Sequence, residues 1–261
     1  MTSLAAASRD LTTPALAVSN VSHAFGEKKV LDGVSLTVEQ GAFVVLLGLN
    51  GAGKSTLFSL ITRLYDNVSG EILIRGFDVR RKPTSALQRL GVVFQSRTLD
   101  SDLSLIQNLK YHAALHGMNS RVAGERAVEA LEIVGLADRA KEKVRSMSGG
   151  QARRVEIARS MMHRPDLLLL DEATVGLDVG SRESVVKIVR NLVANQRLGV
   201  LWATHLMDEV KPTDHIVVLH KGRVLYDGSV PGFLAATKTD TVSAAFRVIT
   251  GTSAEEAAND R

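Results

Sequence analysis

Gly48-Leu49-Asn50-Gly51-Ala52-Gly53-Lys54-Ser55-Thr56 is the stretch of the 261-residue sequence that decides the fold. It fits the pattern of a glycine, four residues, a glycine, a lysine and a serine or threonine, which chance places in only about 1% of chains this long. The glycines allow successive backbone N–H groups to point at phosphate oxygens. A helix starting around Lys54 adds its positive dipole end, so that Lys54 neutralises β and γ phosphates and Ser55 ligates Mg²⁺. The segment predicts a phosphate-binding loop.

The surroundings of this loop predict an α/β fold. The apolar run Phe43 to Leu47 precedes it and is typical of a strand buried on both faces of a parallel sheet. An amphipathic stretch, Thr56 to Leu64, follows the loop. Further short apolar runs at Val92–Val93, Leu167 to Leu170 and Val200 to Ala203 are separated by helical stretches. We therefore expect the core sheet of a P-loop NTPase, covered by helices.

Two antiparallel features flank this core. Leu16 to Ser22 and Val34 to Val38 alternate apolar and polar residues, which is typical of half-buried antiparallel strands. They predict an antiparallel β subdomain. Near the C-terminus, His215 to Leu219 and Arg223 to Asp227 flank Lys221–Gly222, which predicts a hairpin.

Strand signals vanish between Thr98 and Met162, and Asn119 to Val134 has apolar residues spaced by three and four. This pattern predicts an inserted helical subdomain at about 98–162. We expect one domain over residues 14–250, with a flexible leader at 1–13 and a polar, flexible tail at 251–261.

A second acidic element follows the strand predicted at Leu167 to Leu170. Asp171 and Glu172 come directly after it, and ligands of such sheets bind beyond the carboxyl ends of the strands. Neighbouring side chains at a strand end point in different directions, which allows two roles. Asp171 is a candidate metal ligand, and Glu172 a candidate for polarising an attacking water. Strands that end in acidic residues are common, so this element indicates catalysis only in combination with the phosphate loop.

Several further motifs indicate a family. Met147-Ser148-Gly149-Gly150-Gln151 opens a helical stretch and resembles the signature motif of ABC transporter ATPases. Phe25 matches the adenine-stacking aromatic of that family, Gln95 its Q-loop glutamine, Gly176-Leu177-Asp178 its D-loop and His205 its switch histidine. The resemblance covers roughly residues 16–232. Met147 stands where leucine is usual, and Phe25 where tyrosine is commoner; both changes keep size and apolar character.

The resemblance implies ATP and Mg²⁺ as cofactors and assigns site residues. The expected catalytic residues are Glu172, His205, Lys54 and Gln95. The expected metal ligands are Ser55, Gln95 and Asp171. The residues expected to bind nucleotide are Phe25, Asn50, Gly51, Ala52, Gly53, Lys54, Ser55, Thr56, Ser148, Gly149, Gly150, Gln151 and Asp178. Because Glu172 is present, the resemblance implies an active ATPase.

The resemblance also implies partners. In the family, the signature of one subunit closes on the nucleotide of the other, which implies a head-to-tail pair with a second copy or a homologous ATPase subunit. Ser96 to Ser104 would then act as a lever against integral membrane permease subunits. No apolar run approaches the ~20 residues that span a bilayer, so we do not expect the chain to cross a membrane by itself. The resemblance implies a peripheral position at the cytoplasmic face of the inner membrane, through the permease subunits.

Other side chains have plainer interpretations. The net charge is only +4, and the clusters Lys28–Lys29 and Arg80–Arg81–Lys82 are short, so we expect solvated surface and no nucleic-acid partner. There is no cysteine. His112 and His116 share a helical face, but no third ligand is evident for them. The remaining histidines show no metal-ligand grouping and are expected at the surface or in packing; they are His23, His163, His215 and His220.

The subfamily is less sharply defined. The run Thr98 to Gly117 and the segment Ala173 to Asp178 look like ATPases of export-type, ABC-2-like systems. Within those, the chain is most similar to ATPases associated with quinoprotein alcohol oxidation. Two alternatives remain open: a soluble ABC ATPase that is not coupled to transport, and a nucleotide-gated interaction module that does not hydrolyse ATP. Intact Glu172 and His205 argue against the second.

Overall fold

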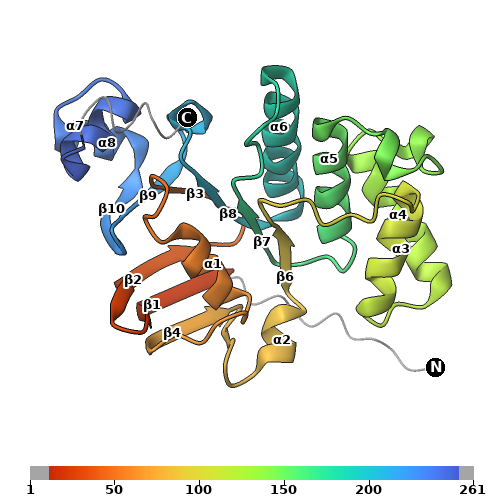
Figure 1. Cartoon of the computed structure of the whole chain (residues 1–261), viewed down its shortest axis with the longest axis horizontal. Helices are drawn as coiled ribbons and strands as arrows, with labels where there is room; N and C mark the ends of the chain where they lie inside the picture. The colour runs from red at the N-terminus through yellow and green to blue at the C-terminus, as the bar shows by residue number, and fades with distance from the viewer. Residues whose placement is uncertain (1–11, 253–261) are drawn as a thin grey trace.

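Residues 12–252 are described in the computed structural model of the chain. The predicted leader, 1–13, and the predicted tail, 251–261, lie for the most part outside the described residues. Figure 1 shows two β-sheets with helices around them. Together these elements confirm the predicted α/β class.

The larger sheet has six strands in the order β10-β9-β3-β8-β7-β6. All neighbours are parallel except the hairpin of β9 and β10. Every residue of β7 and β8 is buried, which explains their unbroken apolar runs. The predicted parallel sheet and C-terminal hairpin are confirmed. The strands are β3 (Phe43–Leu47), β6 (Leu90–Val93), β7 (Leu167–Asp171), β8 (Gly199–Thr204), β9 (His215–His220) and β10 (Arg223–Ser229).

The smaller sheet is antiparallel, in the order β2-β1-β4-β5. Leu16 pairs with Val38 on one side and with Ile74 on the other, and all three are buried. This sheet confirms the predicted antiparallel strands, which extend beyond the predicted segments. The strands are β1 (Leu16–Phe25), β2 (Lys28–Val38), β4 (Ser69–Ile74) and β5 (Phe77–Asp78).

The central strand β3 divides the core into two layers, because successive side chains of a strand point to opposite faces. Val45 and Leu47 pack in a cluster with residues of the helices that follow β6. Val44 and Leu46 pack instead with the smaller sheet and with helix α1 (Lys54–Ile61). The phosphate loop therefore leaves β3 at the point where both layers meet.

The helices fall into groups. α3 (Leu105–Leu115), α4 (Ser120–Ile133) and α5 (Gly149–Ser160) lie together on one side of the larger sheet (Figure 1). Among the described residues between β6 and β7, the structure has no strand and a single isolated bridge. The others are α2 (Pro83–Leu87), α6 (Val179–Gln196), α7 (Val230–Thr237) and α8 (Val242–Thr250). Within residues 12–252, none of these helices combines the length and apolar character of a membrane span.

Candidate nucleotide site

The phosphate loop is shaped by its last glycine. Gly53 precedes α1 with φ of 110°, a conformation that L side chains rarely adopt, and a Cβ there would lie 2.7 Å from Leu31 Cδ2. Lys54 follows at the first position of α1 and is only 4% exposed. Its Nζ donates to the carbonyl oxygens of Gly48 at 2.7 Å and Leu49 at 3.2 Å. The Lys54 side chain is thus folded back across the phosphate loop.

Three side chains converge on Glu172, which directly follows β7. Lys54 Nζ lies 3.2 Å from Glu172 Oε1, and His205 Nδ1 lies 3.1 Å from the same oxygen. Gln95 Nε2 donates to Glu172 Oε2 at 3.1 Å. Gln95 and His205 come just after β6 and β8, the two neighbours of β7, so the ends of parallel strands bring these side chains to one edge of the sheet. The predicted catalytic residues therefore form one contiguous group.

The backbone at Glu172 is in an unusual conformation. Its φ is +47°, in the left-handed region that non-glycine residues adopt at a cost of about 1–3 kcal/mol. The N–H of Glu172 donates to the carbonyl of Ala203 at 3.0 Å, which holds this turn against β8. Sheet pairing therefore stabilises a strained residue at the centre of the site.

Asp171 faces a different direction from Glu172. Its Oδ1 is buried and has no hydrogen-bond partner among the described residues, while the carboxylate also bonds to the Ser55 side chain. Burial raises the pKa of Asp171, and the Ser55 hydrogen bond opposes that change. An orphaned carboxylate oxygen beside a hydroxyl fits a hard cation such as Mg²⁺. Since the amide nitrogen of Gln95 donates to Glu172, the amide oxygen of Gln95 is the atom available for a metal.

A cavity of about 580 Å³ opens in front of these groups. Phe25, at the end of β1, is 46% exposed on its wall, as an adenine-stacking side chain requires. Besides Lys54, three further lysines line it, namely Lys28, Lys29 and Lys221. The interpretation of Lys28 and Lys29 as plain solvated surface therefore missed their place on this wall. The predicted residues that line the cavity are Phe25, Asn50, Gly51, Gly53, Lys54, Ser55, Thr56, Gln95 and Glu172, whereas Ala52 is buried and is not among the lining residues.

The signature residues lie elsewhere. Ser148 is exposed and caps α5: Gln151 N–H donates to Ser148 Oγ at 3.3 Å, and Ser148 N–H donates to Gln151 Oε1 at 3.0 Å. The side-chain oxygen of Gln151 thus acts in the cap. Asp178 caps α6 by accepting from Ser181 N–H at 2.9 Å, and hydrogen bonds from Ser181 lower its pKa. The 580 Å³ cavity is lined by other described residues, and neither residues 148–151 nor Asp178 are among them.

Gly150 has a packing function that the motif did not indicate. It is buried against α6, and a Cβ there would lie 2.6 Å from Ser181 Cβ and 2.4 Å from Ser181 Oγ. We expect G150A to lower the free energy of unfolding by about 1–3 kcal/mol, because α5 and α6 must separate to admit the methyl group. Urea unfolding measures the change.

The matched control for G150A is the double variant G150A/S181G, which removes both clashing atoms. A double-mutant cycle should show a favourable coupling between the two changes, although S181G alone costs stability in a helix. G150A with wild-type stability would contradict the packing assignment.

A clamp joins α5 to the segment after β6. Arg153 is buried, pairs with Glu156 at 2.8 Å, and donates to the carbonyls of Phe94 at 2.6 Å and Gln95 at 2.8 Å. Glu156 in turn accepts from Thr98 N–H at 2.8 Å. The backbone that carries Gln95 is therefore fastened to the helix that Ser148 caps.

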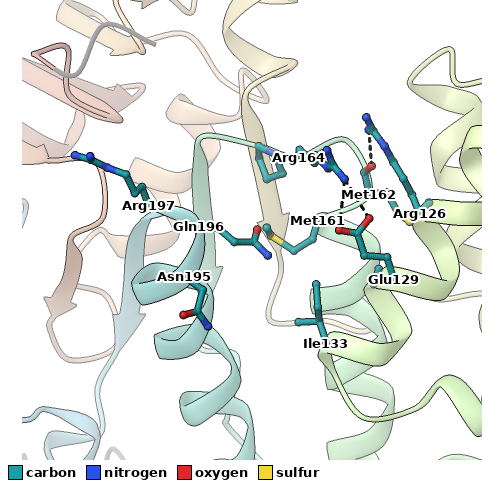
Figure 2. A pocket seen from close by; sticks show the side chains of 11 residues that line it. Arg126, Glu129, Ile133, Met161, Met162, Arg164, Asn195, Gln196 and Arg197 are labelled. Carbon is teal, nitrogen blue, oxygen red and sulfur yellow. Dashed lines mark hydrogen bonds and ion pairs between the residues drawn. The ribbon is translucent and has the colours of Figure 1, made fainter. Parts of the chain in front are cut away.

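A second cavity, of about 500 Å³, lies between α4, the α5–β7 connection and the end of α6 (Figure 2). Arg164 and Glu129 form an ion pair across it at 3.2 Å. Arg126 donates to the carbonyl of Met162 at 3.1 Å. None of the predicted site residues lines this cavity.

One expectation is wrong. His112 and His116 do have a third partner, His163, and one nitrogen of each ring lies within 4.8 Å of the others. The sequence does not indicate this group, because His163 follows α5 whereas the other two histidines lie at the end of α3. Only the packing of the two helices brings them together.

The chain is similar in sequence and fold to known proteins. Residues 31–175 match the family described as ABC transporter. The linearmycin resistance ATP-binding protein LnrL of Bacillus subtilis is 35% identical over 87% of this chain and 73% of its own length. The methionine import ATP-binding protein MetN of Rhizobium johnstonii is 38% identical over 82% of this chain and 60% of its own length.

Two solved structures are similar as well. One is cbiO1 from Clostridium perfringens, part of the ABC transporter complex cbiONQ, with a TM-score of 0.78, 28% identity, and coverage of 87% of this chain and 92% of that one. The other is a dimer of the ATP-binding cassette MJ0796 in a post-hydrolysis state with ADP and Pi. Its TM-score is 0.72 and its identity 26%, over 82% of this chain and 98% of that one.

Proposed function

Since this chain belongs to the ABC transporter family of ATP-binding proteins, we propose that it hydrolyses ATP as one half of a pair of subunits that drives separate membrane-spanning partners. The observation that carries this proposal is the convergence of Lys54, Gln95 and His205 on Glu172. A carboxylate so placed is suited to polarise a water for attack on a phosphate bound by Lys54.

The contacts suggest how binding prepares the reaction. A phosphate at the loop competes with Glu172 for the same lysine ammonium, so the exchange leaves Glu172 with His205 and Gln95 and available to the water. His205 then positions that water for in-line attack on the γ-phosphate. Phe25 stacks on the adenine at the cavity wall. Ser55, Asp171 and Gln95 would hold Mg²⁺, which when bound neutralises charge on the phosphate oxygens.

The pair explains why the signature lies away from the cavity. Ser148 at the exposed N-terminus of α5 offers a second anion-binding surface, and a two-fold axis would place it on the nucleotide of the other subunit. Gly149, Gly150, Gln151 and Asp178 would accompany it. Driving such a pair from 1% to 99% closed needs about 5.5 kcal/mol of differential ATP affinity, which a few charge-assisted hydrogen bonds of roughly 1.5–3 kcal/mol supply.

The membrane partners and the direction of transport are also part of the proposal. Ser96 to Ser104 lies beside Gln95 and would press on a cytoplasmic helix of a permease subunit, which gives the chain a peripheral position at the inner membrane. A resistance protein and an import protein are similarly related to this chain, so the export direction rests on the segments Thr98 to Gly117 and Ala173 to Asp178. The link to quinoprotein alcohol oxidation rests on the same resemblance.

Purification of the full chain from its native membranes, with the integral membrane proteins that accompany it, tests the proposal. ATPase activity should be present in the purified complex and should change when detergent removes the membrane subunits. Purification of an active chain with no accompanying membrane subunit would favour the alternative, a soluble ABC ATPase. Absence of ATPase activity in both preparations would contradict the enzymatic function itself.

A further inference from the structure

The three histidines at the junction of α3, α5 and β6 are not used by ATP chemistry. His112 lies in the last turn of α3 and His116 caps its end, so the two rings share one face. His163 follows the end of α5, and the ring centroids of His116 and His163 are 4.0 Å apart. The cluster lies at the start of β6, whereas Gln95 lies beyond its end.

The hydrogen bonds leave ring nitrogens ready to bind a metal. His163 Nε2 lies 2.9 Å from the carbonyl oxygen of Leu90, and because a carbonyl only accepts, Nε2 carries the hydrogen. Nδ1 of the neutral ring therefore keeps its lone pair, and within residues 12–252 this buried atom has no hydrogen-bond partner, nor does Nε2 of His112. A backbone carbonyl that fixes the tautomer of a histidine is a regular support of metal-binding imidazoles.

We propose that His112, His116 and His163 form a binding site for a divalent transition-metal ion of the zinc class, which joins the end of α3 to the turn after α5. Three imidazole nitrogens suit zinc and leave a fourth position for water, which reaches the site past His116, the most exposed of the three rings. A tetrahedral ion with bonds of about 2.0–2.1 Å needs nitrogens about 3.3 Å apart. The present spacing is up to 4.8 Å and the His116 ring stacks on His163, so the side chains must move closer and the His116 ring must turn when an ion binds.

The electrostatic surroundings keep the rings neutral. Burial lowers the pKa of His112 to about 3, with His116, Arg159 and His163 adding repulsion. Burial, His116 and Arg126 lower the pKa of His163 to about 4 against the raising effect of the Leu90 hydrogen bond, and burial also lowers the pKa of His116. Protons therefore compete little for the nitrogens of His112 and His163 above pH 5. The same two arginines repel a cation, so we expect reversible binding.

Zinc titration calorimetry on the full chain, prepared without a histidine tag, tests the site. We expect one ion per chain at this site, with affinity lowered at least about tenfold by H163Q and by H116Q, since even a supporting residue of a metal site is worth 10- to 100-fold. H116Q changes the most exposed ring and keeps the fold testable. H215Q is the matched control, because His215 lies on β9 and pairs with Asp227.

Two further measurements distinguish this site from zinc binding elsewhere on the chain. D171N should retain the zinc affinity if the histidines bind the ion, and should lose it if the ion binds at the nucleotide site. Co²⁺ should give the visible absorption of a tetrahedral complex in wild type and not in H163Q. Equal zinc affinity in wild type, H116Q and H163Q, or no saturable binding to wild type, would overturn the proposal and leave the rings as a packed aromatic cluster.

Discussion

The variant E172Q is expected to hydrolyse ATP at least about 100-fold more slowly than wild type while still binding ATP and pairing. Glutamine has the size of glutamate and keeps an oxygen that can accept from His205, but it cannot take a proton from water. The change also removes the ion pair with Lys54, leaving that lysine to the carbonyls of Gly48 and Leu49 and to phosphate. ATP affinity should therefore be undiminished, and the pair should persist.

Phosphate release at saturating Mg-ATP and size-exclusion chromatography with and without ATP measure the two effects. E183Q is the matched control, since Glu183 is an exposed residue of α6 and is not among the residues that line the 580 Å³ cavity. It should leave both readouts unchanged. Wild-type turnover in E172Q would refute the role of Glu172, and loss of ATP binding would indicate that Glu172 maintains the loop instead.

The variant S148R is expected to lower ATPase activity at least about tenfold, because a large cation replaces a hydrogen-bonding hydroxyl where the partner's nucleotide would bind. Its own nucleotide cavity should be unaffected, since Ser148 is not among the residues that line it. S148A removes the same helix cap without adding bulk, at a cost of about 0.5–2 kcal/mol in stability. If S148A lowers activity less than S148R does, the loss in S148R comes from blockage of the site and not from loss of the helix cap.

Mixing S148R with E172Q should give more activity than either variant has alone. In a mixed pair, the E172Q chain supplies an intact Ser148 and the S148R chain supplies intact Lys54 and Glu172, so one complete site forms. With about half of the pairs mixed and one of two sites complete, up to about a quarter of wild-type activity should return. Pull-down of two differently tagged copies verifies that mixed pairs exist. No recovery in such pairs would contradict shared sites.

Local patterns were sufficient for much of the fold. The glycines of the loop and the fully apolar runs of β3 and β7 are short-range signals, and the edge of a parallel sheet then brings Glu172, Gln95 and His205 together. The ends of elements were predicted less accurately. The amphipathic pattern continues to Leu64, but α1 ends at Ile61 because the chain turns at Arg63, which has a positive φ.

Tertiary packing decided the features that sequence patterns missed. Gly150 meets Ser181 only because α5 lies on α6. Lys221 reaches the cavity from the turn of the C-terminal hairpin, which pairs with β3 through β9. His163 joins His112 because two helices from separate segments end at the same place. No local periodicity contains such long-range proximity.

The Arg153 clamp has a consequence for timing. One guanidinium bonds the backbone of the glutamine that would sense a subunit's own ATP, and it stands on the helix whose first turn would grip the ATP of the other subunit. In the proposed pair, departure of a phosphate from one nucleotide would then loosen the hold on the second through a single side chain. The two subunits would then complete their ATPase cycles in a fixed order relative to each other. The permease would undergo one coordinated conformational change instead of two independent ones.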